Sequence, residues 1–89
     1  MKTDMKKIYK YPIPVNDEIT ISMPKDAVIL TIQMQKAEPF IWALVDIDKE
    51  MVDVKFRLFG TGMSVYPCLN YVGTFQMLSG GHVFHLFRE

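Results

Sequence analysis

The fold is decided by the stretch Val52-Asp53-Val54-Lys55-Phe56-Arg57-Leu58, in which apolar and polar side chains alternate without a break. Successive side chains of a β-strand point to opposite faces of a sheet. A period of two therefore places the four apolar side chains of this stretch on one face and the three polar ones on the other. The stretch predicts a β-strand with one clearly buried face.

The same period recurs on the N-terminal side of this strand. Residues 28–35 alternate, with Val28, Leu30, Ile32 and Met34 predicted to face the core. Residues 18–23 alternate as well, and Pro24-Lys25-Asp26 between the two segments carries turn residues. We therefore predict that these two strands form a hairpin.

Residues 9–13 predict an opening strand, but Pro12 and Pro14 lack the N–H group that a ladder needs, so this strand should lie at a sheet edge or end there. Residues 40–47 are apolar on both parities. A core helix fits their spacing, but their aromatic and β-branched content, with Pro39 before them, favours a central strand.

The last two predicted strands, residues 71–77 and 82–87, are separated by Ser79-Gly80-Gly81. Gly-Gly between two apolar runs is typical of a hairpin turn. Glycines also interrupt the strand-like patterns at Gly60 and Gly73, where a side chain would pack better. We expect each glycine to provide either close backbone approach or a positive φ.

Six to seven short strands without an amphipathic helix predict an all-β fold, a small antiparallel β-sandwich or barrel. We expect one domain over residues 1–89, with residues 1–6 forming a flexible basic arm. Since residues 40–47 and 82–87 carry apolar side chains on both faces, we predict a homo-oligomer whose interface includes them. The alternative is a closed barrel with scattered apolar side chains on its outer surface.

Composition argues against several function classes. Ten basic and ten acidic residues cancel, so no long-range field would gather nucleic acid or an anionic membrane. Cys68 is the only cysteine, which excludes an internal disulfide and agrees with a reducing cytoplasm. No apolar run approaches the ~18 residues of a membrane-spanning helix. We expect a cytoplasmic protein that binds no membrane and needs no cofactor.

The loop after the central stretch is the candidate binding site. Two glycines in Gly60-Thr61-Gly62 allow successive N–H groups to converge on an anion, and the Arg57 guanidinium suits phosphate. The alternative is a tight strand exit in which glycine supplies a positive φ. Trp42, Tyr66 and Tyr71 are aromatics suited to stacking on a base or anchoring an interface, although core packing explains them equally well. His82 or His85 could contact a nucleobase or a partner subunit. The predicted ligand-binding residues are Arg57, Gly60, Thr61, Gly62, Ser64, Trp42, Tyr66 and His82.

His82 and His85 are three residues apart, so on a strand they point to opposite faces and cannot chelate one metal ion. Each is predicted to be a partly buried, hydrogen-bonded side chain. The sequence contains no recognisable acid–base pair, metal set or activated nucleophile. We therefore predict a protein that is not an enzyme, with no catalytic residue and no metal site.

Three motifs carry a family resemblance: Lys-Ile-Tyr-Lys-Tyr-Pro-Ile from Lys7, Phe-Gly-Thr-Gly from Phe59 and Tyr-Val-Gly-Thr-Phe-Gln from Tyr71. With His-Val-Phe-His from His82, they resemble a family of short, poorly characterised bacteriophage and prophage proteins, over most of the chain. No catalytic motif defines that family. The resemblance implies a phage-encoded protein acting in the host bacterial cytoplasm.

Combined with the glycine-rich loop and Arg57, the resemblance favours a non-enzymatic binding protein that antagonises host antiviral defence by sequestering a small (cyclic) nucleotide signal between subunits. A direct inhibitor of a host or defence protein is the first alternative, acting by strand addition at an exposed sheet edge. A virion or assembly accessory protein is the second.

Overall fold

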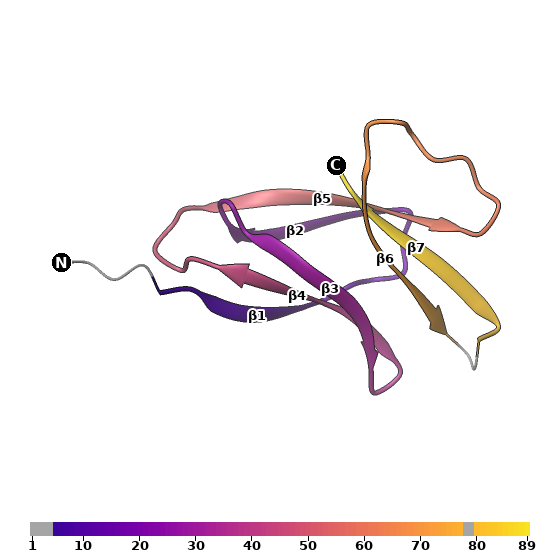
Figure 1. The fold of residues 1–89 in the computed structure, drawn as a ribbon, viewed down its shortest axis with the longest axis horizontal. Coiled ribbons are helices and arrows are strands. Elements are labelled where there is room, and N and C mark those ends of the chain that lie inside the picture. Colours follow the sequence, from indigo (N-terminus) through magenta and orange to yellow (C-terminus); the bar gives the residue numbers. More distant parts are fainter. Residues whose placement is uncertain (1–4, 78–79) are drawn as a thin grey trace.

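The computed structural model describes residues 5–77 and 80–89. These residues form seven strands and no helix. The strands are β1 (Lys7–Pro12), β2 (Glu18–Pro24), β3 (Val28–Gln35), β4 (Glu38–Val45), β5 (Met51–Gly60), β6 (Asn70–Met77) and β7 (His82–Arg88). They build two antiparallel sheets, one ordered β1-β4-β3 and the other β2-β5-β7-β6 (Figure 1). The predicted all-β fold is confirmed, as a small β-sandwich rather than a closed barrel.

The core lies between the two sheets and is built from alternating side chains of β4 and β5. Val54, Phe56 and Leu58 of β5 are buried, as their alternation predicted. Ile41 and Val45 of β4 are fully enclosed. Segment 40–47 is thus largely a central strand, paired with β1 on one side and β3 on the other, which confirms the strand interpretation over the helical one.

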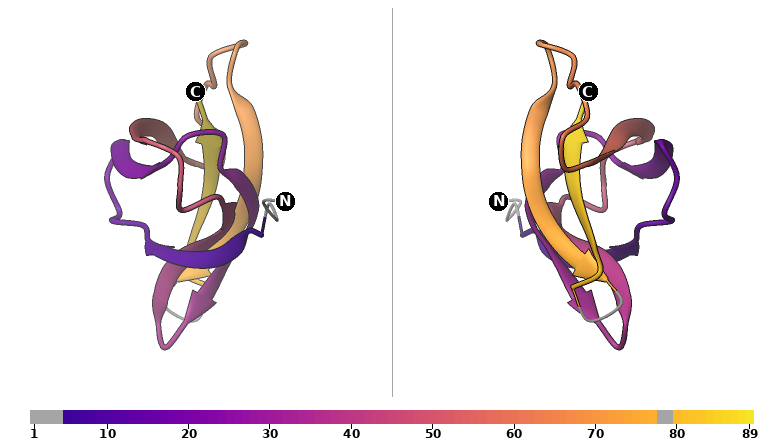
Figure 2. Two further views of the ribbon diagram at one scale, coloured as in Figure 1. Left: turned by 90° about the vertical axis from the view of Figure 1, so that its left-hand side faces the viewer. Right: turned by 90° about the vertical axis from the view of Figure 1, so that its right-hand side faces the viewer.

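The two ends of the chain follow the sequence predictions. β1 is an edge strand that ends at Pro12, after which the Ile13 N–H donates to the Pro39 carbonyl at 3.0 Å. β6 and β7 pair antiparallel and run side by side, and the loop of residues 61–69 lies beyond one end of this pair (Figure 2). Ser79 of the predicted closing turn lies outside the described residues.

The predicted hairpin between residues 18–23 and 28–35 is wrong. β2 pairs with β5, with Ile19 opposite Phe56 and Met23 opposite Val52, whereas β3 pairs with β4 in the other sheet. Between them the chain turns at Asp26, which has a φ of 65°. The turn residues were identified correctly, but this turn connects a strand of one sheet to a strand of the other. The reason is that the apolar side chains of β2 pack beside those of β5.

The alternation predicted for β3 is also wrong in its first half. The register against β4 shifts between Ile29 and Thr31, so Leu30 is an extra residue in a β-bulge. One inserted residue exchanges the faces on either side of it. Val28 and Leu30 therefore face outward, each 48% exposed, while Ile32 after the bulge is buried as expected.

Gly73 of β6 allows the two sheets to approach at the side where β3 meets β6. A β-carbon built on Gly73 would lie 2.5 Å from Cγ2 of Ile32. Gly73 is not among the glycines with a positive φ, so close approach is the reason for this residue. This is one of the two explanations that the sequence pattern left open.

Candidate functional site

The segment after β5 forms a tight turn. The Met63 N–H donates to the Gly60 carbonyl at 3.2 Å, and Gly62 at the third position has a φ of 92°, as in a type II turn. The Gly60 N–H donates to the Met63 sulfur at 3.1 Å. Two N–H groups of the Gly60–Met63 turn are therefore used within it, a geometry that matches the strand-exit interpretation better than an anion-binding concavity.

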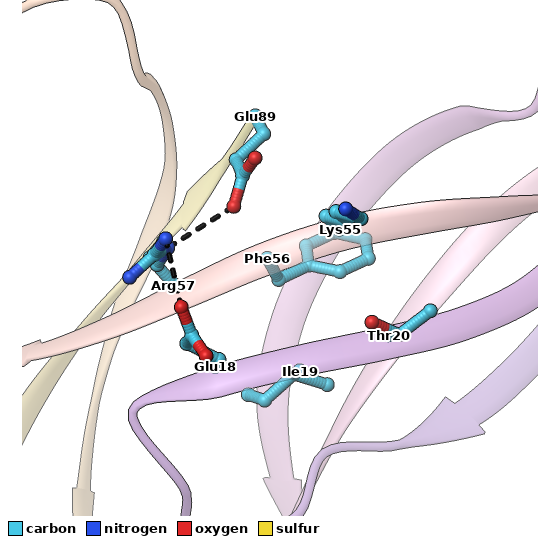
Figure 3. Close-up of a pocket in the computed structure, with 7 residues that line it drawn as sticks. All are labelled: Glu18, Ile19, Thr20, Lys55, Phe56, Arg57 and Glu89. Carbon is cyan, nitrogen blue, oxygen red and sulfur yellow. Dashed lines mark hydrogen bonds and ion pairs between the residues drawn. The ribbon is translucent and has the colours of Figure 1, made fainter.

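Arg57 lies on the outer face of the four-stranded sheet between two carboxylates (Figure 3). Its Nη2 lies 2.9 Å from Glu18 Oε1, and its Nε donates to Glu89 Oε2 at 3.0 Å. The hydrogen bond with Glu89 holds the pKa of Arg57 above its ordinary value, and the charge of Glu18 adds to this effect. A phosphate at this position would therefore compete with both carboxylates.

A network of hydroxyl groups centred on His85 connects the turn to β6. His85 Nε2 lies 2.8 Å from Thr61 Oγ1, and His85 Nδ1 lies 2.8 Å from Thr74 Oγ1. Thr74 Oγ1 is in turn 2.6 Å from the Tyr71 hydroxyl. Both ring nitrogens of His85 have partners, which agrees with the prediction of a partly buried, hydrogen-bonded histidine.

Four aromatic rings form a continuous row beside this network. The ring centroids are 6.4 Å apart for Tyr66 and Phe59, 5.5 Å for Phe59 and Phe87, and 5.4 Å for Phe87 and Tyr71. Phe59 is buried although it stands outside the main core, because Tyr66 and Phe87 pack against it. The two ends of the row remain open, since Tyr66 is 57% and Tyr71 60% exposed.

The structure brings together most, but not all, of the residues predicted from the sequence. Those gathered on the outer face of the four-stranded sheet or in its adjoining loop are Arg57, Gly60, Thr61, Gly62, Ser64 and Tyr66. Trp42 lies on the outer face of the other sheet, opposite Lys10 and Thr31. His82 lies at the start of β7, on the face opposite to His85, with its ring stacked 6.2 Å from that of Phe84. It is exposed, so the prediction of a partly buried side chain is wrong for His82.

Sequence reasoning named Tyr71 and His85 separately as side chains that could contact a base, but it missed Thr74 and the meeting of all three on this surface. The sequence does predict one part of this arrangement, because strand alternation places His85 on the same face as Phe87 and opposite to Leu86. Which loop residue would meet His85 depends on the path of residues 61–69, which no local pattern specifies. We refer to the row of four rings with His85, Thr61 and Thr74 as the aromatic surface.

Within residues 5–77 and 80–89, no group of histidine, cysteine or acidic side chains is arranged to hold a metal ion. In the same part of the chain, no helix is long and apolar enough to cross a membrane. The aromatic surface offers rings for stacking and side chains that form hydrogen bonds.

Comparison with known proteins gives a family without an assigned function. No curated protein and no solved structure matches the chain. Residues 5–89 match the model of a family described as a domain of unknown function, DUF7352. Because that match spans nearly all of the sequence, the chain belongs to the DUF7352 family.

Proposed function

We propose that this chain is a non-enzymatic binding protein that holds the base of a small nucleotide on its aromatic surface. The observation that carries the proposal is the row of rings with two open ends, Tyr66 and Tyr71, beside hydroxyl groups and an imidazole. Stacking on an aromatic side chain contributes about 1–3 kcal/mol per base. Thr61, Thr74 and His85 add donors and acceptors for the edge of the base.

The charges around Arg57 determine how such a ligand would be held. Glu18 and Glu89 already neutralise the guanidinium, so its positive charge adds little attraction for phosphate. Recognition should therefore rest on the base, with the phosphates toward solvent. It follows that Glu89→Gln, which frees one side of Arg57, should strengthen the binding of a nucleotide by several-fold.

The biological setting of the proposal comes from the resemblance to bacteriophage proteins. A phage protein that holds a nucleotide without converting it would deplete a signal of host antiviral defence. The target we propose is accordingly a cyclic di- or trinucleotide or an ADP-ribose derivative in the host cytoplasm.

Calorimetric titration with that panel of nucleotides tests the proposal. Tyr66→Ala and Tyr71→Ala should each weaken binding about tenfold, which corresponds to about 1.4 kcal/mol. Tyr9→Ala is the matched control, because Tyr9 is an exposed tyrosine on the other sheet and should leave the affinity unchanged. Absence of heat with every nucleotide, at protein concentrations in the high micromolar range, would refute the proposal.

A second candidate function is direct inhibition of a host protein by strand addition, and the exposed edge of β1 favours it. Lys6, Lys7 and Lys10 lie in or next to this strand, whose residues are exposed apart from half-buried Tyr11. An extended acidic segment would pair with such an edge. A host protein that copurifies with the wild-type chain, and is lost with Lys7→Glu or at high salt, would support this function over nucleotide binding.

A further inference from the structure

The outer face of the three-stranded sheet carries a group of apolar side chains that is exposed on β1 and β3 and half-buried on β4. The register of β4 against its neighbours sets Ile8, Leu44 and Val28 in one row across the sheet. Trp42 lies in the next row, and the bulge adds Leu30 beside it. Ile8 is 61% exposed. We define the β4 face as the outward side chains Ile8, Val28, Leu30, Phe40, Trp42 and Leu44.

One charged side chain, Lys10, extends over this face from β1 toward β3. Lys10, opposite Trp42 in the register, extends its Nζ to 2.7 Å from Gln35 Oε1 and lies 4.5 Å from the centre of the Phe40 ring. The ammonium group is thus held by a side chain of β3 and by an aromatic ring. Around Leu44 the β4 face presents the apolar side chains Ile8 and Val28, while Lys10 and Thr31 flank Trp42 in the next row.

The two sheets differ in how their outer faces are protected. On the four-stranded sheet, Tyr66 from the loop of residues 61–69 packs on Phe59 and makes it a buried residue. On the three-stranded sheet, no described side chain covers Val28 or Leu30 to a comparable degree. The other strand predicted to supply an interface, β7, carries His85 and Phe87 on its outer face, where both belong to the aromatic surface.

We propose that a second copy of this chain covers the β4 face, packing sheet on sheet about a two-fold axis near Trp42. The exposed parts of the six side chains amount to roughly 400 Å² per chain, within the range of about 300–600 Å² for the largest apolar patch of a monomer. Two such faces contribute about 800 Å², and the polar residues around them would supply the remaining ~400 Å² of the about 1,200 Å² that a small specific interface buries. The interface therefore suits a dimer that dissociates on dilution.

Charge favours a second copy as the occupant. Ten basic and ten acidic side chains give the chain a formal net charge of zero, so two copies meet without long-range repulsion. The one charge on the face, the Lys10 ammonium, is already bound by Gln35 and the Phe40 ring, so it offers little attraction to a partner of opposite charge. Flat sheets packed face to face, about 10 Å apart, match surfaces of this shape.

Sedimentation equilibrium from low micromolar to millimolar concentration tests the proposal, with the fluorescence of Trp42 as a second measurement. The wild-type chain should convert from monomer to dimer, and the emission of this sole tryptophan should shift to shorter wavelength as the dimer forms. Leu30→Glu should raise the dissociation constant at least a hundredfold. Because Leu30 is at an exposed bulge, this variant should keep the wild-type circular dichroism spectrum.

Val15→Glu is the matched control, since Val15 is an exposed aliphatic residue in the segment between β1 and β2 and lies outside the β4 face. It should dimerise like the wild type. A wild-type chain that remains monomeric at millimolar concentration overturns the proposal. The proposal is also wrong if the chain stays monomeric and a different protein binds the β4 face. A dimer that persists in both Leu30→Glu and Trp42→Glu overturns it equally.

Discussion

Replacement of Gly73 by alanine should destabilise the sandwich, because the new methyl group would occupy space that Ile32 already fills. The added β-carbon would lie 2.5 Å from Cγ2 of Ile32. Non-bonded carbon atoms prefer a separation of about 3.5–4.0 Å, so one group must move by about 1.0–1.5 Å. Cγ2 is attached directly to the branched β-carbon of Ile32, which has little rotational freedom in a strand.

Two opposing effects set the expected magnitude. Overpacking of this kind costs about 1–3 kcal/mol. Removing a glycine from a strand returns about 0.5–1 kcal/mol through the lower entropy of the unfolded chain. We therefore expect Gly73→Ala to lower the free energy of unfolding by about 1 kcal/mol, within net limits of about 0–2.5 kcal/mol, measured by urea denaturation.

Two further variants test the cause. Ile32→Leu keeps the side-chain volume but removes the branch at the β-carbon, so Gly73→Ala should become neutral or stabilising in that background. Gly60→Ala is the control, because its β-carbon would lie 3.6 Å from the Met63 sulfur, an ordinary contact. A Gly73→Ala variant that is more stable than the wild type would refute the reasoning from close approach.

Three further predictions concern other parts of the chain. Gly62→Ala should lower stability by about 1–2 kcal/mol in urea denaturation, since an alanine at a φ of 92° is strained. Phe56→Asp should abolish the folded circular dichroism spectrum, because an unpaired buried charge costs several kcal/mol against a total free energy of unfolding of roughly 5 kcal/mol. Leu30→Asp, at an exposed position, should remain folded. A folded Phe56→Asp variant with an unfolded Leu30→Asp variant would contradict the face assignments. The hydrogen bond from Lys49, at 2.8 Å, lowers the pKa of the Asp26 carboxyl in the folded protein. The stability that this ion pair contributes is therefore present above the unfolded pKa of Asp26 and is lost as pH falls through its folded pKa. An NMR titration should show a higher pKa of Asp26 in the Lys49→Gln variant.

Local patterns predicted the strands well where one physical rule applied. The missing N–H of Pro12 led to the edge position of β1, and apolar side chains on both parities led to the central position of β4. The three-residue spacing of His82 and His85 placed them on opposite faces, as found. Each of these features depends on the covalent chain over a few residues, and the sequence determines it directly.

Only the tertiary structure decided which elements meet. The sequence predicted a turn at Lys25, but the pairing of β2 with β5 arises from the burial of Ile19 beside Phe56, far apart in the chain. The bulge at Leu30 depends on the register in which β3 pairs with β4. A single inserted residue moves the side chains before it to the face opposite to the one that alternation predicts.

The same holds for the candidate site. Arg57 was recognised as a cation suited to phosphate, but Glu18 and Glu89, which neutralise it, come from the start of β2 and from residue 89. Sequence alone determined the side chains and their faces, because alternation is a local property of an extended chain. Their partners are set by the packing of the two sheets, since contacts between distant residues depend on the burial of the whole core.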